Sequence, residues 1–238
     1  MLRLIVLLVV LVVTGCQVDY GTLLTNEEQQ AAQSVKNEKD KLNQALLEAA
    51  AKGDQAAIAS LLADGADIDA TDDRGRTSAM IAVHTKQLSI FTLLAEKGAN
   101  INIRDERSDN PLLYAGAEGL LDFVKASLAA GADTRLTNRF GGTALIPAAD
   151  RGHVDVVKEL LAHSDVAVDH VNNLGWTALL EAIILGDGGN DHQAIVRLLI
   201  EHGANVNLAD REGVTPLKHA ETRGYKEMAK MLTLAGAK

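Results

Sequence analysis

The sequence is poor in cysteine, in aromatic residues and in proline, and each shortage excludes a class of protein. Its 238 residues contain one cysteine, so an internal disulfide framework and a cysteine-rich metal site are both excluded. Aromatic residues make up 3% and prolines number three, while 47% of the residues are hydrophobic. The hydrophobic content is therefore carried by aliphatic side chains and alanine, which suits a helical protein with close helix contacts.

The chain also has no surplus of positive charge. It carries 23 Lys and Arg residues against 32 Asp and Glu residues, for a formal net charge of -9. Proteins that bind nucleic acid usually show a basic surplus, which neutralises phosphate groups. We therefore expect no nucleic-acid partner.

The N-terminus begins with an export pattern. Residues 4–13 are all aliphatic, and Arg3 places a positive charge just before them. Such a run is typical of a secretory signal segment, and it is shorter than the roughly 20 apolar residues of a membrane-spanning helix. The run ends at Val13-Thr14-Gly15-Cys16, which resembles the lipobox of bacterial lipoproteins. The resemblance implies that the chain is cut before Cys16 and that its sulfur carries a diacylglycerol.

This resemblance also implies a location. Residues 1–15 are expected to be a lipoprotein signal peptide, and residues 16–41 a polar, partly helical tether. Gln17 rather than an aspartate follows the cysteine, which in the lipoprotein sorting pattern implies the outer membrane. The chain is thus expected in the bacterial cell envelope, held by fatty acids such as palmitate and facing the periplasm. An ordinary signal peptide with an incidental cysteine is the alternative. Thr25 and Glu28 match a capping box, which predicts a helix start near Asn26.

From residue 42 onward the sequence repeats itself. An apolar residue in a V-x-x-L-L context recurs at intervals of 33, 33, 33, 39 and 33 residues, and an alanine on the segment before it recurs as well. Gly-Ala pairs close five of the copies. The apolar positions are Ile58, Phe91, Val124, Val157, Val196 and Ala229, and the alanines are Ala49, Ala82, Ala115, Ala148, Ala182 and Ala220.

These copies resemble the ankyrin repeat, with its pattern D-x-x-G-x-T-P-L-H-x-A-A, a V-x-x-L-L helix and a Gly-Ala stop. The clearest copy runs from Asp210 to Ala237, with Gly213, Thr215 and Pro216 in register. The resemblance covers residues 42–238 and implies an all-α fold, an ankyrin-repeat solenoid of about six helix-turn-helix repeats with β-hairpin fingers. The approximate repeats are 42–72, 73–105, 106–138, 139–172, 173–210 and 211–238.

A polar residue stands where each first helix of a repeat should begin. Its side chain can accept a hydrogen bond from a backbone N–H group that has no partner within the helix. The expected capping residues are Thr77, Thr143, Thr177 and Thr215, with Asn110 in place of threonine in one repeat. Because a single repeat cannot bury its apolar face alone, neighbouring repeats must stack.

The fifth repeat is longer than the others. Thr177 to Val196 spans 19 residues, against 14 in the fourth repeat, so five residues are inserted between its two helices. The insert at 186–193 is expected to project as a glycine-rich turn, away from the fingers. Its Asp187, Asn190 and Asp191 offer oxygen ligands of the kind that calcium takes, but the bidentate glutamate of a calcium loop is missing. A metal-binding or enzymatic role of this insert is the alternative function.

No catalytic motif stands out elsewhere. The sequence has no G-x-S-x-G, no Walker loop and no H-E-x-x-H, and Cys16 offers no free thiol once it is acylated. We expect no catalytic residue, no metal ion and no cofactor.

The ankyrin resemblance implies that binding takes place on a concave face, which the finger tips and the exposed sides of the first helices form. Arginine and tryptophan, which contribute strongly to interfaces, occupy these positions although the whole chain is acidic. The candidate partner-binding residues are Arg74, Arg76, Arg107, Arg139, Phe140, Leu174, Trp176, Arg151, Leu185 and Arg211. In the alternative reading, Phe140 and Trp176 pack between hairpins, and the arginines pair with Asp72, Asp105 and Asp210.

Together these patterns predict a non-catalytic protein–protein interaction module. It is expected to be monomeric, to be attached to a membrane through its lipid anchor, and to bind a partner protein in its concave groove. The partner is expected to be a protein of the bacterial envelope or a secreted toxin. The protein would then serve either as an immunity protein against an antibacterial effector or as a helper of an envelope enzyme.

Overall fold

The structure is a computed structural model, and it describes residues 25–238. The expected signal peptide, the expected lipidation site Cys16 and the first part of the expected tether lie outside the described residues. The chain divides between Glu38 and Lys39 into two compact units. Among the described residues, no helix combines the length and the hydrophobicity that crossing a membrane requires.

Twelve helices, in six successive pairs, make up the described part of the chain. They are α1 (Asn26–Lys52), α2 (Gln55–Ala63), α3 (Ser78–His84), α4 (Leu88–Glu96), α5 (Pro111–Ala117), α6 (Leu121–Ala129), α7 (Leu145–Asp150), α8 (Val154–His163), α9 (Ala178–Ile184), α10 (Asn190–Glu201), α11 (Pro216–Arg223) and α12 (Lys226–Leu234). The described residues contain no strand, only an isolated bridge between Thr71 and Thr77. The predicted α-helical solenoid is therefore confirmed, and its fingers are loops rather than β-hairpins.

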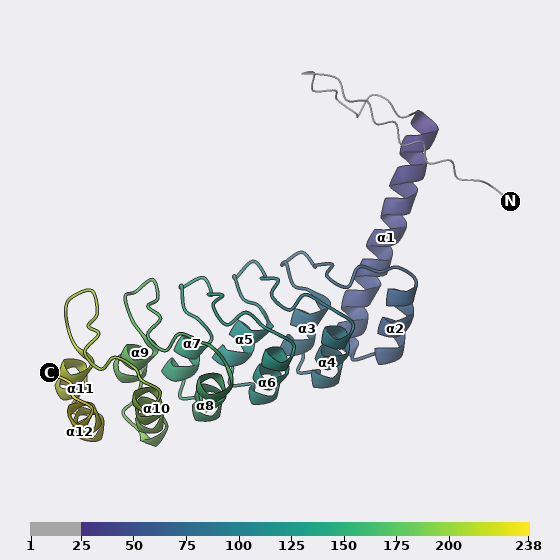
Figure 1. The fold of residues 1–238 in the computed structure, drawn as a ribbon. Helices are drawn as coiled ribbons and strands as arrows, with labels where there is room; N and C mark the ends of the chain where they lie inside the picture. Colours follow the sequence, from purple (N-terminus) through teal and green to yellow (C-terminus); the bar gives the residue numbers. More distant parts are fainter. Residues whose placement is uncertain (1–24) are drawn as a thin grey trace, which may run out of the picture. The chain divides into compact units, whose positions relative to one another are not determined.

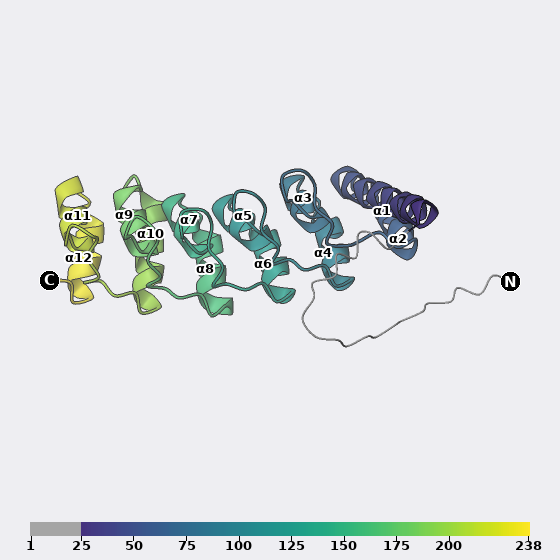
Figure 2. The same ribbon diagram turned by 90° about the horizontal axis from the view of Figure 1, so that it is seen from above.

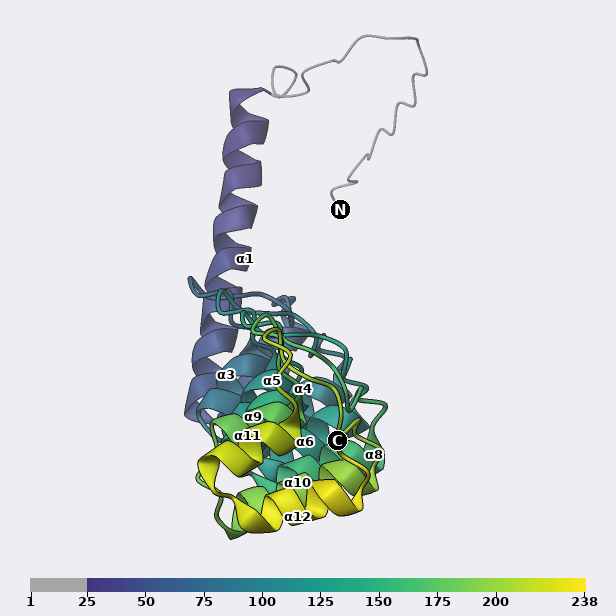
Figure 3. The ribbon, with the colours of Figure 1, turned by 90° about the vertical axis from the view of Figure 1, so that its left-hand side faces the viewer.

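The helix pairs are stacked in two rows. From α3 onward the first helices of the pairs, α3, α5, α7, α9 and α11, pack side by side, and the second helices, α4 to α12, form the other row (Figures 1 and 2). The loops between pairs extend to one side, which the view along the rows from the α11–α12 end also shows (Figure 3). We call the tips of these loops the first to fifth fingers; they comprise residues 72–76, 105–109, 138–142, 172–176 and 210–214.

One Asp or Asn side chain closes each finger. In the first finger, Asp72 Oδ1 accepts hydrogen bonds from the backbone N–H groups of Arg74 and Arg76, both at 2.9 Å. The backbone N–H of Asp72 donates to the carbonyl oxygen of Arg76 at 3.0 Å. The same bonds recur at Asp105, Asn138, Asn172 and Asp210. Because each finger is closed by its own first residue, its shape is determined locally.

The fourth position of each finger requires a left-handed backbone. Gly75 has a φ of 73° in the first finger, whereas in the second finger Ser108 adopts a φ of 62°. A side chain at such a φ is strained, because its Cβ approaches the following carbonyl oxygen. The second finger therefore carries local strain that the first one avoids.

Four of the five expected caps form. Thr77 Oγ1, for example, accepts a hydrogen bond from the backbone N–H of Met80 at 3.2 Å. The side chains of Asn110, Thr177 and Thr215 do the same in their repeats. These hydrogen bonds confirm the predicted starts of α3, α5, α9 and α11.

The predicted cap at Thr143 is wrong, because its hydroxyl group is buried without a hydrogen-bond partner. The cause lies four residues further on, at Pro147, which has no N–H group to donate to the Thr143 carbonyl oxygen. That oxygen instead accepts from the backbone N–H of Ile146 at 3.2 Å, and α7 begins only at Leu145. In the capped repeats, the carbonyl oxygen of the capping residue accepts from the residue four positions on and its side chain from the residue three positions on. Pro147 removes the first of these hydrogen bonds, and the second does not form.

The repeating apolar positions form the core. All six alanines of the first helices are buried, with at most 5% of their surface exposed, and so are five of the six apolar positions of the second helices. The sixth, Ala229 in α12, is partly exposed. Phe91 and Phe123 meet edge to face, with ring centroids 5.9 Å apart. Small side chains on one row let the helices approach, and aliphatic ones fill the layer beneath.

Helix α1 begins as the capping box predicts. The backbone N–H of Thr25 donates to Glu28 Oε2 at 2.8 Å, and the backbone N–H of Glu28 donates to Thr25 Oγ1 at 3.3 Å. The helix then continues to Lys52, so the boundary expected between residues 41 and 42 lies within a helix.

The insert of the fifth repeat is partly helical. Residues 190–193 belong to the first turn of α10, so the expectation of a turn over the whole insert is wrong. Asp187 Oδ1 accepts from the backbone N–H of Gly189 at 2.8 Å, and Gly189 O accepts from the backbone N–H of Gln193 at 2.9 Å. The acidic Asp191 lies in the same turn, where the positive end of the helix dipole favours it. These interactions extend α10 toward its N-terminus.

Candidate binding groove

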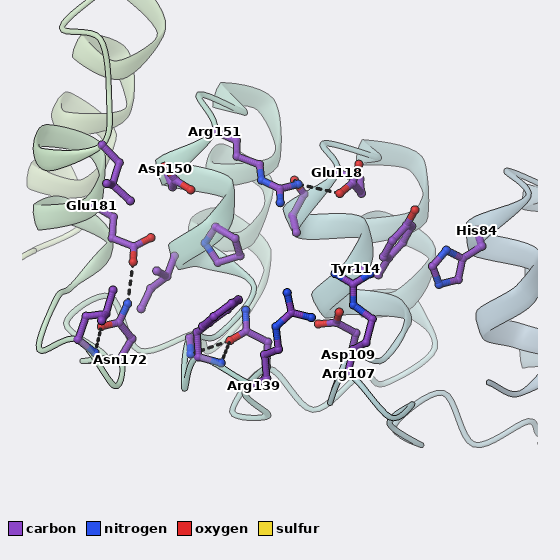
Figure 4. A pocket seen from close by; sticks show the side chains of 18 residues that line it. His84, Arg107, Asp109, Tyr114, Glu118, Arg139, Asp150, Arg151, Asn172 and Glu181 are labelled. Carbon is purple, nitrogen blue, oxygen red and sulfur yellow. Dashed lines mark hydrogen bonds and ion pairs between the residues drawn. The ribbon is translucent and has the colours of Figure 1, made fainter. Parts of the chain in front are cut away.

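A cavity of about 510 Å³ opens among the first helices and the fingers of the middle repeats (Figure 4). Its walls come from α5, α7 and α9 and from the second, third and fourth fingers, with His84 of α3 at one end. We call it the central groove. The helices are fixed by the core, and the fingers by their own hydrogen bonds, so both kinds of wall are held in place without a ligand.

The central groove collects six of the ten candidate partner-binding residues. They are Arg107, Arg139, Phe140, Arg151, Leu174 and Leu185. The other four, Arg74, Arg76, Trp176 and Arg211, do not line it.

Each of these four residues has another environment. Arg76 forms an ion pair with Asp72, with Nη2 2.7 Å from Oδ2, and lies at a second cavity beside α1 and α3. Trp176 is half-buried, and Arg74 and Arg211 are exposed on the first and fifth fingers. The alternative of an arginine–aspartate pair within a finger therefore holds for Arg76.

Three large apolar side chains stand open in the central groove. Phe140 is 55% exposed, and Leu174 and Leu185 are each 51% exposed. The alternative that Phe140 packs between hairpins is therefore wrong; the Arg139 guanidinium carbon lies 4.6 Å from its ring centroid instead. Side chains of this size normally leave water on folding, and a cluster that stays exposed typically marks an interaction surface.

The arginines of the groove differ in their partners. Arg151 donates from Nη1 to Glu118 Oε1 and to the carbonyl oxygen of Ala117, both at 2.7 Å (Figure 4). Arg107 and Arg139, on the second and third fingers, form no ion pair with any carboxylate in the described residues. These two guanidinium groups keep their donors available for a ligand.

Besides Glu118, three carboxyl groups line the same groove, and burial raises the pKa of each of these three. Burial, followed by the negative charge of Asp150, raises the pKa of Glu181 to about 7. The Asn172 amide opposes this shift by donating from Nδ2 to Glu181 Oε1 at 2.7 Å. Burial also raises the pKa of Asp150 and, together with the charge of Asp105, the pKa of Asp109. The groove is thus partly anionic and partly cationic.

The end of the groove at α3 is aromatic. The rings of His84 and Tyr114 lie with their centroids 4.0 Å apart, and His84 Nε2 is buried without a hydrogen-bond partner. Burial lowers the pKa of His84, and the nearby charge of Arg76 lowers it further, so the imidazole is neutral at pH 7.

Sequence reasoning missed Glu181, Asn172 and Tyr114 as groove residues. A signal was present for Glu181, since it is the single charged residue of α9, whose sequence is otherwise aliphatic. Asn172 gave no such signal, because its position is the one that closes every finger.

The insert does not form a metal site in the structure. Asp187 Oδ1 already accepts from the Gly189 N–H and lies 2.9 Å from His192 Nδ1. No group of three or more His, Cys, Asp or Glu side chains within residues 25–238 is placed to hold a metal ion. The carboxylate of Asp187 is used to cap and hold the insert itself.

Comparison with known proteins identifies the repeats. The family profile described as ankyrin repeats (3 copies) matches residues 18–105, 112–189 and 188–238. The chain is also 43% identical over 189 residues to the ankyrin repeat protein YahD of Escherichia coli (strain K12). That alignment covers 79% of this chain and 94% of YahD.

Solved structures show the same arrangement. An ankyrin repeat domain from Acinetobacter baumannii AYE matches with a TM-score of 0.79 and 53% identity, over 81% of this chain and 98% of that one. The ankyrin repeat domain of Bcl-3, a member of the IkappaB protein family, matches with a TM-score of 0.74 and 26% identity, over 82% of this chain and 86% of Bcl-3. With its six helix pairs, its capped first helices and these relatives, the chain belongs to the ankyrin repeat family.

Proposed function

We propose that this protein binds a partner protein through the central groove. Ankyrin repeats are protein–protein interaction modules and are typically non-catalytic. The observation that carries the proposal is that Phe140, Leu174 and Leu185, each about half exposed, gather in one cavity. A partner that covers them removes apolar surface from water, and the nearby arginines can bond its polar groups.

In this proposal the groove forms one part of a larger protein–protein interface. A cavity of about 510 Å³ holds a few side chains. A standard protein–protein interface buries about 1,600 Å² in total, which is far more than a few partner side chains in this cavity would bury. The exposed arginines on the outer fingers, Arg74 and Arg211, offer further contacts on either side of the groove.

A membrane location completes the proposal. The chain would be acylated at Cys16 and held in the bacterial envelope, at the outer membrane and facing the periplasm. This rests on Arg3, the aliphatic run at 4–13, the Val13–Cys16 tetrad and Gln17. The partner would be an envelope protein, which this chain assists, or a secreted toxin, which it neutralises.

The test is a comparison of two surfaces on one protein. Full-length protein is used to capture partners from envelope extract, alongside a Phe140→Ser/Leu174→Ser variant. The matched control is Val171→Ser/Leu234→Ser, which alters two exposed apolar side chains outside the groove. We expect the groove variant to lose a partner that wild type and control both retain.

Equal capture by all three proteins would move the interface elsewhere. Identification of the captured protein then separates the two roles, because an antibacterial effector indicates immunity and a resident envelope enzyme indicates assistance. Helical circular dichroism of each variant shows that a loss of binding is not a loss of fold.

A further inference from the structure

We propose that the central groove recognises a partner segment of mixed charge. A lysine or arginine side chain of the segment lies toward Asp150 and Glu181, and an aspartate or glutamate side chain meets Arg107 and Arg139. This inference rests on the proposed function, and it specifies the chemistry of the segment that the groove binds.

The two carboxylates at the acidic end of the groove form no ion pair with any described residue. Asp150 ends α7 and Glu181 lies in α9, the neighbouring first helix, and both line the cavity. Glu181 is only 7% exposed, and the one hydrogen bond of its carboxylate comes from the neutral amide of Asn172. The Asp150 carboxylate makes no hydrogen bond or ion pair with any described residue. Carboxylates removed from water in this way are stabilised by an incoming cation.

The protein's own cations nearby are engaged elsewhere. The Arg151 guanidinium points to Glu118 and the Ala117 carbonyl oxygen on the α5 side (Figure 4). The His192 imidazole bonds the backbone oxygen of Asp150 rather than its carboxylate. The raised pKa of Glu181, at about 7, results from burial and from the charge of Asp150. A cationic side chain between the two would lower it again.

The basic end lies on the fingers. Arg107 and Arg139 belong to the second and third fingers, both are exposed, and neither is ion-paired within the described residues. Asp109 lines the same part of the groove and balances one of the two charges. One net positive charge with open bidentate donors remains, which suits a carboxylate.

The two ends together select the kind of partner. A nucleic acid presents negative charge along its whole length and would be repelled by Asp150 and Glu181, in addition to the net charge of -9. A protein segment can carry a cation and an anion within a few residues, with an apolar side chain between them for Phe140 and Leu174. Charge complementarity of this kind gives specificity and orientation to docking.

The experiment uses a random peptide library displayed on phage, selected against the full chain purified in detergent. We expect the enriched peptides to carry one basic and one acidic residue around an apolar one. Synthetic copies are then titrated by fluorescence anisotropy against Asp150→Asn/Glu181→Gln and against Arg107→Gln/Arg139→Gln. Both pairs are nearly isosteric, and each is expected to weaken binding at least about tenfold.

Matched controls separate the effect of local contacts from the long-range electrostatic effect of changing the protein's net charge. They are Asp73→Asn/Glu212→Gln for the carboxylates and Arg197→Gln/Arg223→Gln for the arginines, all exposed residues outside the groove. A second peptide replaces the basic residue by norleucine. We expect this second peptide to bind wild type weakly. Its affinity for Asp150→Asn/Glu181→Gln should equal the affinity of the parent peptide for the same variant.

The outcomes distinguish this inference from the proposed function. If binding is weakened by Phe140→Ser/Leu174→Ser but not by either isosteric pair, the mixed-charge inference is overturned and the groove remains the binding site. If Phe140→Ser/Leu174→Ser also binds the peptides with full affinity, both the mixed-charge inference and the proposed function are overturned. Equal losses in the controls, or no enrichment of peptides over the Phe140→Ser/Leu174→Ser protein, likewise overturn the inference.

Discussion

His192 Nε2 lies 2.8 Å from the backbone oxygen of Asp150, across 42 residues of sequence. The contact bonds the insert of the fifth repeat to the end of α7 in the fourth. On its other side, the Tyr225 hydroxyl of the sixth repeat donates to the carbonyl oxygen of Gly186 at 2.9 Å. The insert is thus held between two repeats instead of projecting freely, and it follows directly on Leu185 in the groove wall.

Replacing His192 should loosen this part of the array. His192→Leu removes the bonds to the Asp150 carbonyl and to Asp187 while keeping an apolar body, so we expect a loss of about 1–2 kcal/mol in the free energy of unfolding. Urea unfolding measures it. His202→Leu is the control, since exposed His202 bonds only within its own helix and should cost less than about 0.5 kcal/mol. Equal losses would mean that the inter-repeat contact contributes nothing.

Glu181 should destabilise the fold at alkaline pH. Its pKa rises from an ordinary value of 4.5 to about 7 on folding, so the folded state holds the proton more tightly than the unfolded state does. The resulting penalty is absent below the unfolded pKa, grows as pH rises, and is complete above the folded pKa. Glu181→Gln, which keeps the oxygen that Asn172 bonds, should therefore stabilise by about 2–3 kcal/mol at pH 9 and by less than about 0.5 kcal/mol at pH 4.5.

Denaturant unfolding of both proteins at the two pH values measures this difference. The exposed Glu96→Gln serves as control and should show the same stability as wild type at both. A gain from Glu181→Gln that does not depend on pH would have to come from packing, and the linkage argument would then be wrong.

Thr143 and Thr177 occupy the same position in their repeats, but their hydroxyl groups differ in partners. Thr143→Val should raise the stability by about 0.5–1 kcal/mol, because a buried hydroxyl without a hydrogen bond is removed. Thr177→Val should lower it by about 0.5–2 kcal/mol, because the bond from the backbone N–H of Leu180 is lost. Thermal unfolding of the two variants is the measurement, and the same sign for both would contradict the role of Pro147.

The fourth position of a finger is serine in the second finger and glycine in the first, and each residue can be replaced by the other. Ser108→Gly should stabilise the fold by about 0.5 kcal/mol, because glycine adopts the left-handed backbone at this position without strain. The Ser108 hydroxyl forms no hydrogen bond within the described residues, so its removal costs none. Gly75→Ser should destabilise by about 1 kcal/mol or more, because its φ is 73° and a Cβ there would lie 3.3 Å from the backbone nitrogen of Glu106. The urea midpoints of unfolding test both changes. A lower midpoint for Ser108→Gly than for wild type would contradict the interpretation that Ser108 is strained.

The proposed lipid anchor at Cys16 can be tested by a direct chemical label. When the full chain is expressed in a bacterium fed a clickable palmitate analogue, we expect the label on wild type and none on Cys16→Ser. A Cys16→Ser/Ser34→Cys variant keeps one cysteine outside the tetrad and should also stay unlabelled. Label or unchanged membrane association in Cys16→Ser would contradict the lipobox interpretation.

The sequence predicts the array well because its repeat is local and redundant. Ala148 and Val157 recur at the spacing of the repeat, and both are fully buried. Thr143 shows the limit, since it follows the repeat pattern, but Pro147 further along removes the hydrogen bond that the pattern implies.

The groove was harder to predict because its residues acquire their character from neighbouring repeats. The resemblance to ankyrin repeats placed Phe140 and Leu174 on fingers, but their exposure depends on what the adjacent finger covers. The pKa of Glu181 depends on Asp150, which lies 31 residues earlier and becomes its neighbour only when α7 packs on α9. The bonds of His192 and Tyr225 likewise cross between repeats, and no local pattern predicts them.

The closure of each finger by its own Asp or Asn has a consequence for how such proteins diverge. The hydrogen bonds that shape the third finger involve the Asn138 side chain and backbone groups, whereas the side chains of Arg139 and Phe140 take no part in them. Mutations at these two positions can change the ligand while the loop keeps its shape. Specificity can therefore drift between descendants of one ancestral protein without each step being constrained by stability.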